Sequence, residues 1–342
     1  MPLSLPFMIH LLLRTMIQPT STVKNPVEVL KHSVARTQSP GSSTVLIAYV
    51  DGQRGKATPQ LHDINLPLKF KCNPTVRSLR GERESDMDLM IHSSTFLLPD
   101  FPADNGFSLL YSLVVLNQPL PKFTPLLWNH ACFHVCADGG ANRLYDEFPQ
   151  LFPDEDAFAI RKRYRPDVIK GDMDSIRAEV LEFYSNLGTK TIDASHDQDS
   201  TDMHKCVAYI RDLPNLDKQN LCILVAGALG GRFDHEAGNI NILCRFSTIR
   251  IVLLSDDCLI QLLPSSHHHE IHIQSSVEGP HCGLIPIGIP SKRTTTTGLQ
   301  WDLTDTEMRF GGLMSTSNIV KGEIVTIRSD SDLLWTISIK KA

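Results

Sequence analysis

Two short motifs of the chain bring aspartates together at spacings that could hold a divalent cation. Asp172 and Asp174 are two residues apart, so both side chains leave the same face of an extended segment. Asp199 and Asp202 are three apart at the start of a predicted helix, where such side chains are neighbours. Carboxylates with few histidines or cysteines nearby suit Mg²⁺ that is bound partly by phosphate oxygens. The motifs therefore predict a Mg²⁺ site, with helix or turn capping as the alternative for any one aspartate.

Glycines stand close to these aspartates and could present backbone N–H groups to a phosphate chain. A polyphosphate approaches the backbone closely only where no Cβ obstructs it, and a helix start adds a favourable dipole. Glycine also ends many ordinary strands, so a Gly-Gly pair alone is a weak signal. The sequence has neither G-x-x-x-x-G-K-[ST] nor a protein-kinase glycine loop, so a nucleotide site here would have another design. Arg232 could bind phosphate through its planar fork or form a surface ion pair. The glycines are Gly139, Gly140, Gly227, Gly230 and Gly231.

The elements that position these residues alternate between strands and helices from about residue 108 to 257. Short runs rich in Val, Ile and Leu predict strands, and longer amphipathic stretches predict helices. This alternation predicts a parallel sheet with right-handed crossovers, and ligands bind such a sheet beyond the carboxyl ends of its strands. The aspartates and glycines follow these strands directly. The predicted strands are 109–116, 133–137, 168–169, 221–226 and 249–254, and the predicted helices are 175–187, 201–213 and 235–246.

Beyond residue 258 the pattern changes to closely spaced strands separated by turn residues. This pattern predicts an all-β module, a small sandwich. The three consecutive histidines at 267–269 alternate between faces of a strand and are expected to form a solvated edge rather than a metal site. The predicted strands are 259–263, 269–273, 284–287, 294–303, 324–327 and 333–339.

The first 94 residues differ from the rest in charge and periodicity. They hold 11 Lys or Arg against 7 Asp or Glu, whereas the whole chain has a net charge of −5. No sustained period of 3.6 or 2 occurs there, so we expect a mostly unstructured extension. The predicted organisation is an extension at 1–94, an α/β domain at 95–257 and a β-sandwich domain at 258–342.

Composition limits the classes of partner. The 342 residues are 42% hydrophobic and 21% charged, which is typical of a globular protein of two domains. The negative net charge argues against nucleic acid and anionic membranes as partners, and no apolar run is long enough to span a bilayer. Eight scattered cysteines without a CxxC pair indicate reduced thiols and a cytoplasmic location. The basic, Ser- and Thr-containing start only weakly resembles a mitochondrial presequence.

Six motifs taken together resemble the eukaryotic thiamine pyrophosphokinase family over residues 95–342. Each motif is weak alone, but all six occur in the family's order and approximate spacing. Lys170 departs from the pattern, because relatives are expected to have a neutral or small residue there. The motifs are CADGGANRLY (136–145), GDMDS (171–175), DQDSTD (197–202), GGRFDH (230–235), TTTGLQW (295–301) and STSN (315–318).

The resemblance implies a homodimer in which a Rossmann-like N-terminal domain binds ATP and a C-terminal sandwich completes the thiamine site across the subunit interface. By resemblance, the Mg²⁺ and catalytic set is Asp172, Asp174, Asp199 and Asp202. The ATP and phosphate contacts are Asp138, Gly139, Gly140, Asn142, Gln198, Thr201, Gly230, Gly231 and Arg232. The thiamine contacts are Asp234, Trp301, Ser315 and Asn318.

The activity that follows from the resemblance is transfer of pyrophosphate from Mg·ATP to the hydroxyl group of thiamine, with AMP leaving. An aspartate such as Asp172 or Asp199 would accept the hydroxyl proton, and the sequence does not choose between them. Two alternatives stay open: a Mg²⁺-dependent nucleotide phosphohydrolase, and a catalytically silent protein that binds thiamine or nucleotide. The first leaves Trp301 and the β module without a role, and the second would be expected to lack some of the carboxylates.

Overall fold

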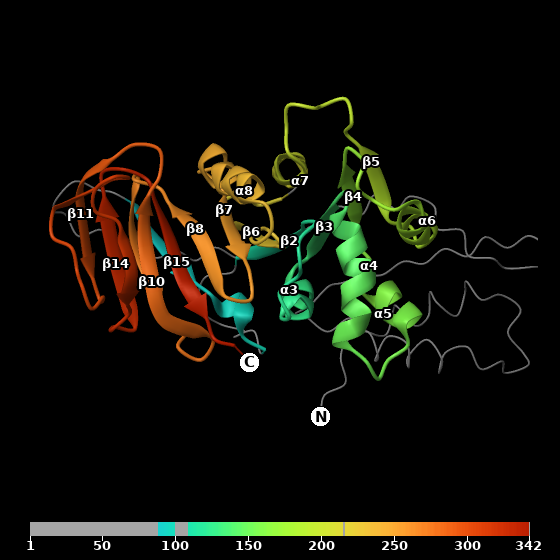
Figure 1. Ribbon diagram of the computed structural model, residues 1–342, viewed down its shortest axis with the longest axis horizontal. Coiled ribbons are helices and arrows are strands. Elements are labelled where there is room, and N and C mark those ends of the chain that lie inside the picture. Colours follow the sequence, from blue (N-terminus) through green and yellow to red (C-terminus); the bar gives the residue numbers. More distant parts are fainter. Residues whose placement is uncertain (1–87, 100–108, 215, 342) are drawn as a thin grey trace, which may run out of the picture. The chain divides into compact units, whose positions relative to one another are not determined.

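The computed structural model describes residues 88–99, 109–214 and 216–341, which all fall within one unit of the chain. These residues form two β-sheets and six α-helices, with one short 3-10 helix (Figure 1). None of the helices in these ranges is long and apolar enough to cross a membrane. The predicted α/β class is confirmed at this level.

A ten-stranded sheet runs through the structure, and six adjacent strands of it are parallel (Figure 1). The parallel part begins at β7, which also pairs antiparallel with β8, so the predicted boundary at residue 257 falls between two paired strands of one sheet. The strands in sheet order are β13 (Ser315–Ile319), β10 (Glu278–Pro286), β15 (Leu333–Ile339), β8 (Cys258–Leu263), β7 (Arg250–Leu254), β6 (Leu221–Ala226), β2 (Leu110–Val115), β3 (Phe133–Ala137), β4 (Val168–Gly171) and β5 (Lys190–Asp193).

Helices cover both faces of the parallel part, because alternate residues of its strands are apolar on both sides. Leu113 of β2 packs in one cluster with Leu127 and Phe148, while its neighbour Val114 packs in another with Met203. Figure 1 shows α7 and α8 on one side of the sheet and α3, α4 and α5 on the other. The helices are α3 (Thr124–His130), α4 (Gly140–Leu151), α5 (Ala157–Arg163), α6 (Ala178–Asn186), α7 (Asp202–Arg211) and α8 (Phe233–Arg245).

A second sheet of five strands packs on the antiparallel part of the first. Ile271 and Ile327 of this sheet share a buried cluster with Leu284 and Trp335 of the other, as the apolar inner faces of a sandwich do. The strand-rich C-terminal region predicted from the sequence is therefore present. Its strands in order are β1 (Asp88–Ser93), β9 (His267–His272), β14 (Ile324–Ser329), β11 (Ser291–Thr297) and β12 (Thr306–Met308).

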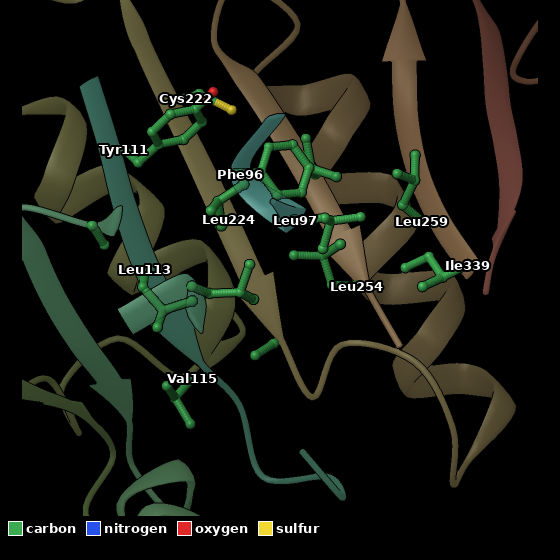
Figure 2. Packing of buried hydrophobic residues seen from close by; sticks show 14 of the residues in the cluster. Phe96, Leu97, Tyr111, Leu113, Val115, Cys222, Leu224, Leu254, Leu259 and Ile339 are labelled. Carbon is green, nitrogen blue, oxygen red and sulfur yellow. The ribbon is translucent and has the colours of Figure 1, made fainter. Parts of the chain in front are cut away.

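Strand β1 corrects the predicted unstructured extension at its C-terminal end. Residues 88–93 pair in parallel with β9, and the short helix η1 (Thr95–Leu97) follows. Phe96 and Leu97 are 2% and 5% exposed, and Figure 2 shows them among Leu224, Leu254 and Leu259. The short β1 has little periodicity of its own, and its partner strand lies far along the chain, so local pattern could not reveal it. The remaining residues of the extension, 1–87, lie outside the described part of the chain.

The histidines of β9 also differ from the prediction. His269 is 2% exposed, and its Nδ1 lies 3.0 Å from Nε2 of His92 in β1. His269 Nε2 donates to the carbonyl oxygen of Pro264 at 2.9 Å. The expectation of a solvated edge is therefore wrong for His269, because β1 covers it.

Candidate active site

A cavity of about 400 Å³ lies at the carboxyl ends of the parallel strands. The chain runs outward from β2 to β3, β4 and β5 on one side and then returns to β6 on the other side of β2. Such a reversal is where open α/β sheets bind ligands. The walls include Asn117 and Gln118 after β2, Asp172, Asp174 and Ser175 after β4, Thr201 and Asp202 at the start of α7, Gly227 and Gly230 after β6, and Asp234, His235 and Asn239.

Two carboxylates of this cavity contact a buried lysine. The ammonium group of Lys205, in α7, forms an ion pair with Asp172 and lies 3.9 Å from Oδ1 of Asp202. The Lys205 side chain is 2% exposed, whereas those of Asp172 and Asp202 are 25% and 34% exposed. Burial, followed by the nearby carboxylate of Asp138, raises the pKa of Asp202 to about 6, while Lys205 opposes this shift.

Asp138 stabilises the loop that carries Asp172 and Asp174, and it does not line the cavity. The residue is fully buried and has a left-handed backbone, with φ of 43°. Its Oδ2 and Oδ1 accept hydrogen bonds from the backbone N–H groups of Ser175 and Ile176, both at 3.0 Å. Burial raises the pKa of Asp138, although these two hydrogen bonds favour its ionised form. The carboxylate predicted to contact ATP therefore shapes the turn after Asp174.

Asn142 acts on the same loop from α4. Its Nδ2 donates to the carbonyl oxygen of Ser175 at 2.9 Å, and its Oδ1 accepts from the N–H of Arg177 at 3.0 Å. Both polar atoms of this side chain are therefore engaged within the chain. Asn142 therefore stabilises the loop that carries Asp172 and Asp174. Asn142 itself does not line the cavity.

Gly139 and Gly140 are explained by packing. A Cβ at Gly140 would lie 2.1 Å from the carbonyl oxygen of Val115, and one at Gly139 would lie 2.3 Å from Nδ2 of Asn117. The backbone contact at Gly140 requires glycine where α4 begins beside β2, whereas the contact at Gly139 is with the end of a side chain that could move. Neither residue lines the cavity, and their predicted contact with phosphate stays a prediction.

The glycine turn after β6 forms another wall of the cavity. Gly227, Gly230 and Gly231 have φ values of 71°, 94° and 84°, a left-handed region that favours glycine. The N–H of Gly230 donates to the carboxylate of Glu236, and a Cβ at Gly231 would lie 2.5 Å from Oε1 of Gln118. Gly227 and Gly230 line the cavity, whereas Gly231 fits against the segment that follows β2.

Arg232 and Asp234 pair with each other beside this turn. Nε of Arg232 donates to Oδ1 of Asp234 at 3.1 Å, and both side chains are more than half exposed. This contact holds the pKa of Asp234 below its ordinary value. Asp234 lines the cavity and Arg232 does not.

Three of the four aspartates predicted to bind Mg²⁺ line the cavity. Asp199 is exposed and lies outside its walls, as does Gln198, whose Nε2 donates to the carbonyl oxygen of Ser195 at 2.7 Å. Thr201 is the N-cap of α7, because its Oγ1 accepts from the N–H of His204. Asp202 follows this cap as the first residue of α7, while Asp199 belongs to the preceding loop.

The predicted thiamine contacts of the β region form a second, separate group. Asn318 is 2% exposed; its Oδ1 accepts from the N–H of Trp301 at 3.2 Å, and its Nδ2 donates to the carbonyl oxygen of Trp301 at 2.9 Å. Nδ2 also lies 3.0 Å from Oγ of Ser315. Asn318 therefore fixes the turn that carries Trp301, whose side chain is 55% exposed. No residue of this group lines the acidic cavity.

The donor atoms of the cavity suit a hard cation whose coordination is completed by phosphate oxygens. Within the described ranges, no three His, Cys, Asp or Glu side chains are arranged to hold a metal ion by themselves. Oδ1 of Asp202 is buried without a hydrogen-bond partner, and Asp172 and Asp174 line the same cavity. Mg²⁺ is commonly held by one or two carboxylates together with phosphate oxygens and water. These carboxylates could therefore hold Mg²⁺ that arrives with a polyphosphate.

Several residues of the site were not predicted. Lys205 stands three residues after Asp202, and this spacing on a helix was the available signal for it. Asn117 and Gln118 follow β2 without an aspartate or glycine motif, so the sequence had no chemical signal for them. Asn239 comes from the second turn of α8, and its Nδ2 donates to the carbonyl oxygen of Ala228 at 2.8 Å.

A parallel sheet with an acidic, glycine-lined cavity at its reversal point defines an α/β protein suited to a nucleotide or polyphosphate. Residues 124–253 match the family model for the catalytic domain of thiamin pyrophosphokinase, and residues 268–334 match that for its vitamin B1 binding domain. The chain is 70% identical to thiamine pyrophosphokinase 1 of Arabidopsis thaliana over 75% of this chain and 96% of that protein. The chain therefore belongs to the thiamin pyrophosphokinase family, which confirms the resemblance seen in its motifs.

Other relatives agree with this assignment. Thiamine pyrophosphokinase 1 of Oryza sativa subsp. japonica is 63% identical over 73% of this chain and 98% of that protein. The crystal structure of yeast thiamin pyrophosphokinase superposes with a TM-score of 0.62 at 25% identity, covering 78% of this chain and 96% of the yeast chain. The acidic cavity falls in the part that matches the catalytic domain, and Trp301 falls in the part that matches the vitamin B1 binding domain.

Proposed function

We propose that this protein transfers the pyrophosphoryl group of ATP to the hydroxyl group of thiamine, giving thiamine diphosphate and AMP. The observation that carries this proposal is the acidic cavity at the sheet reversal, in a chain of the thiamin pyrophosphokinase family. The six parallel strands then serve as a Rossmann-like nucleotide-binding sheet. Their carboxyl ends supply Asp172 and Asp174 from one side of β2 and the glycine turn from the other.

In the proposed reaction, the thiamine hydroxyl oxygen attacks the β-phosphorus of ATP in line with the bond to the oxygen that bridges the α- and β-phosphates. That bond breaks, and AMP leaves with the bridging oxygen. Asp172, Asp174 and Asp202 would hold Mg²⁺, which neutralises charge on the phosphate oxygens when it is bound. The chain itself contributes mainly position and electrostatics.

The hydroxyl proton requires an acceptor near the cavity. Of the two aspartates that the sequence left open, Asp172 lines the cavity and Asp199 does not. We therefore assign the acceptor role to Asp172. Lys205 fixes the orientation of this carboxylate through their ion pair.

We further propose that the protein is a homodimer and that a second copy completes the thiamine site. Trp301 is exposed but lies outside the acidic cavity of its own chain, as do Ser315 and Asn318. Phe310 and Leu313, from the segment before β13, are also exposed, at 66% and 45%. A cationic, flat thiamine ring suits the face of an indole, which a neighbouring subunit would supply.

The activity is tested by incubating the protein with Mg·ATP and thiamine and identifying every product. The expected products are AMP and thiamine diphosphate in equal amounts. ADP or free phosphate would instead indicate a nucleotide phosphohydrolase or another phosphoryl transfer. Binding of thiamine without turnover would indicate a catalytically silent protein. The same incubation without thiamine is the control, and it should release no AMP.

A further inference from the structure

Lys205 is the buried cation of the acidic cavity. Its side chain is 2% exposed, and its two ion pairs in the described structure are with Asp172 and Asp202. Lysine is almost never this buried without a partner, because removing an ammonium group from water is costly. The buried charge of Lys205 is therefore compensated by these two carboxylates.

The two carboxylates lie between this ammonium group and the cavity. Asp172 and Asp202 both line the cavity and stay 25% and 34% exposed, whereas Lys205 is absent from its walls. Oδ1 of Asp202, the atom 3.9 Å from the ammonium group, is buried and accepts no hydrogen bond, so it lies on the lysine side of this carboxylate. Lys205 thus compensates the charge on the side of both carboxylates that faces it, and their partly exposed, cavity-lining sides remain able to bind a cation.

Local packing keeps this arrangement compact. A Cβ at Gly171 would lie 2.6 Å from Cβ of Asp138 and 2.9 Å from Oδ1 of Asp202, so these carboxylates crowd around the end of β4. Mutual repulsion among Asp138, Asp172 and Asp202 would push such a cluster apart if no positive charge lay beside it. Lysine is suited to this place because it is a compact point charge on a long stem.

We propose that Lys205 is a positioning residue for the transfer reaction: it acts as a built-in cation beneath Asp172 and Asp202 and holds them in place before the metal and nucleotide arrive. This inference rests on the proposed function for the reaction that the carboxylates serve. It leads to opposite expectations for metal binding and turnover. Removing the ammonium group removes a like charge near the metal, and a bound divalent cation itself offsets the repulsion among the carboxylates, so divalent cations should bind more tightly. Turnover should fall, because the orientation of Asp172 is lost.

The test compares Lys205→Met with the wild-type protein and with Lys162→Met, an exposed lysine of α5. Mn²⁺ alone is titrated against each protein and followed by electron paramagnetic resonance. We expect Lys205→Met to bind Mn²⁺ at least about tenfold more tightly, as the removal of a nearby like charge predicts. We expect turnover at saturating substrates to fall by about a hundredfold or more, the scale of a lost electrostatic group. Lys162→Met should match the wild type in both measurements.

Unchanged or weaker Mn²⁺ binding in Lys205→Met would overturn the proposal, and so would turnover near the wild-type level. If Lys205→Met does not fold, the double variant Lys205→Met with Asp172→Asn restores the balance of buried charge and is compared with Asp172→Asn alone. Tighter Mn²⁺ binding by the double variant supports the proposal, and equal binding contradicts it. The Mn²⁺ titration needs no substrate, so failure of the proposed reaction in the wild-type protein would be seen separately.

Discussion

Carboxylates of the same residue type have different surroundings around the cavity. Asp138 is fully buried and accepts two backbone hydrogen bonds, and Asp202 is partly buried with one oxygen that accepts no hydrogen bond. Asp234 is exposed and paired with Arg232. These differences raise the pKa of Asp138 and Asp202 and lower that of Asp234. The roles of the carboxylates therefore follow from their surroundings and not from residue type.

The raised pKa of Asp202 predicts how the stability of the metal-free protein depends on pH. Its pKa rises from the ordinary value of 3.8 to about 6, so the folded state binds more protons than the unfolded state between these values. The contribution of Asp202 to stability is therefore lost as pH rises through this window. Asp202→Asn should remove that loss. Urea unfolding in the presence of EDTA, across about pH 4 to pH 7, measures it.

Asp199→Asn is the matched control for this experiment, because Asp199 is exposed and outside the cavity. Its free energy of unfolding should follow the wild-type dependence on pH. If the curves for Asp202→Asn and the wild type run parallel, Asp202 titrates in the folded protein as it does in the unfolded chain.

Gly171 tests whether the carboxylate cluster is as crowded as the structure indicates. In Gly171→Ala the new Cβ would meet Cβ of Asp138 at 2.6 Å and Oδ1 of Asp202 at 2.9 Å. We expect a loss of about 1 to 3 kcal/mol in the free energy of unfolding, as overpacking of a tight site predicts. Denaturant unfolding measures the change.

The control is Gly238→Ala in α8, where nothing lies within 4 Å of the added Cβ. That variant should be more stable than the wild type by about 0.5 to 1 kcal/mol, because alanine is a better helix residue than glycine. Equal effects of the two substitutions would show that Gly171 is not constrained by the carboxylates.

Among the elements, β1 and η1 connect the start of the described chain to both sheets. Beyond the pairing of β1 with β9, Arg250 of β7 donates to the carbonyl oxygen of Ile91 at 2.6 Å. Ser94 donates to Oε1 of the buried Glu278 at 2.8 Å, a hydrogen bond to the first residue of β10. This segment is therefore part of the folded core and not of a dispensable extension.

Phe96→Ala should reveal the contribution of this segment. Phe96 is 2% exposed within the main cluster, so we expect a loss of about 3 to 5 kcal/mol in the free energy of unfolding. Leu89→Ala on β1, where the side chain is 52% exposed, is the control and should change stability by less than about 1 kcal/mol. A small effect of Phe96→Ala would contradict the packing shown in Figure 2.

At the scale of the whole molecule, the predicted site residues fall into two groups on different parts of the chain. The acidic cavity lies at the reversal of the parallel sheet, and the group around Trp301 lies at β13 and the turn before β12. The residues of the Trp301 group do not line the acidic cavity. The proposed homodimer would join them by placing two copies of the chain together.

Combining two inactive variants in one dimer tests whether the cavity of one copy and the Trp301 group of the other form one site. Asp202→Asn and Trp301→Ala are co-expressed with different tags, and the dimer that carries both tags is isolated. If each site combines the cavity of one chain with the Trp301 group of the other, the mixed dimer has one intact site. Random pairing should then restore about a quarter of wild-type activity before isolation, and the isolated mixed dimer about half.

The matched control pairs Asp202→Asn with Asp172→Asn, both in the cavity. No mixed dimer of these variants has an intact site, so activity should stay low. The proposed shared site is wrong if the first pair also stays inactive while both variants bind each other. A monomeric mass in light scattering would contradict the homodimer itself.

Much of the fold was predictable from sequence because its signals are local. The strands at 133–137, 221–226 and 333–339 were predicted with the bounds that the structure has, since short apolar runs between turn residues are typical of buried strands. The order of strands and helices then limited the topology to a parallel sheet with crossovers. The same order placed Asp172, Asp174 and the glycine turn at one edge of that sheet.

The sequence by itself determined the family, the alternation of elements and most carboxylates of the site, because motifs, periodicity and turn residues are properties of neighbouring residues. Only the tertiary structure decided that Lys205 is buried beneath Asp172, that Asp138 and Asn142 support a loop, and that Asp199 lies outside the cavity. It also decided that β1 joins a strand far along the chain. These outcomes depend on burial and on contacts between distant segments, and a local pattern carries no record of either.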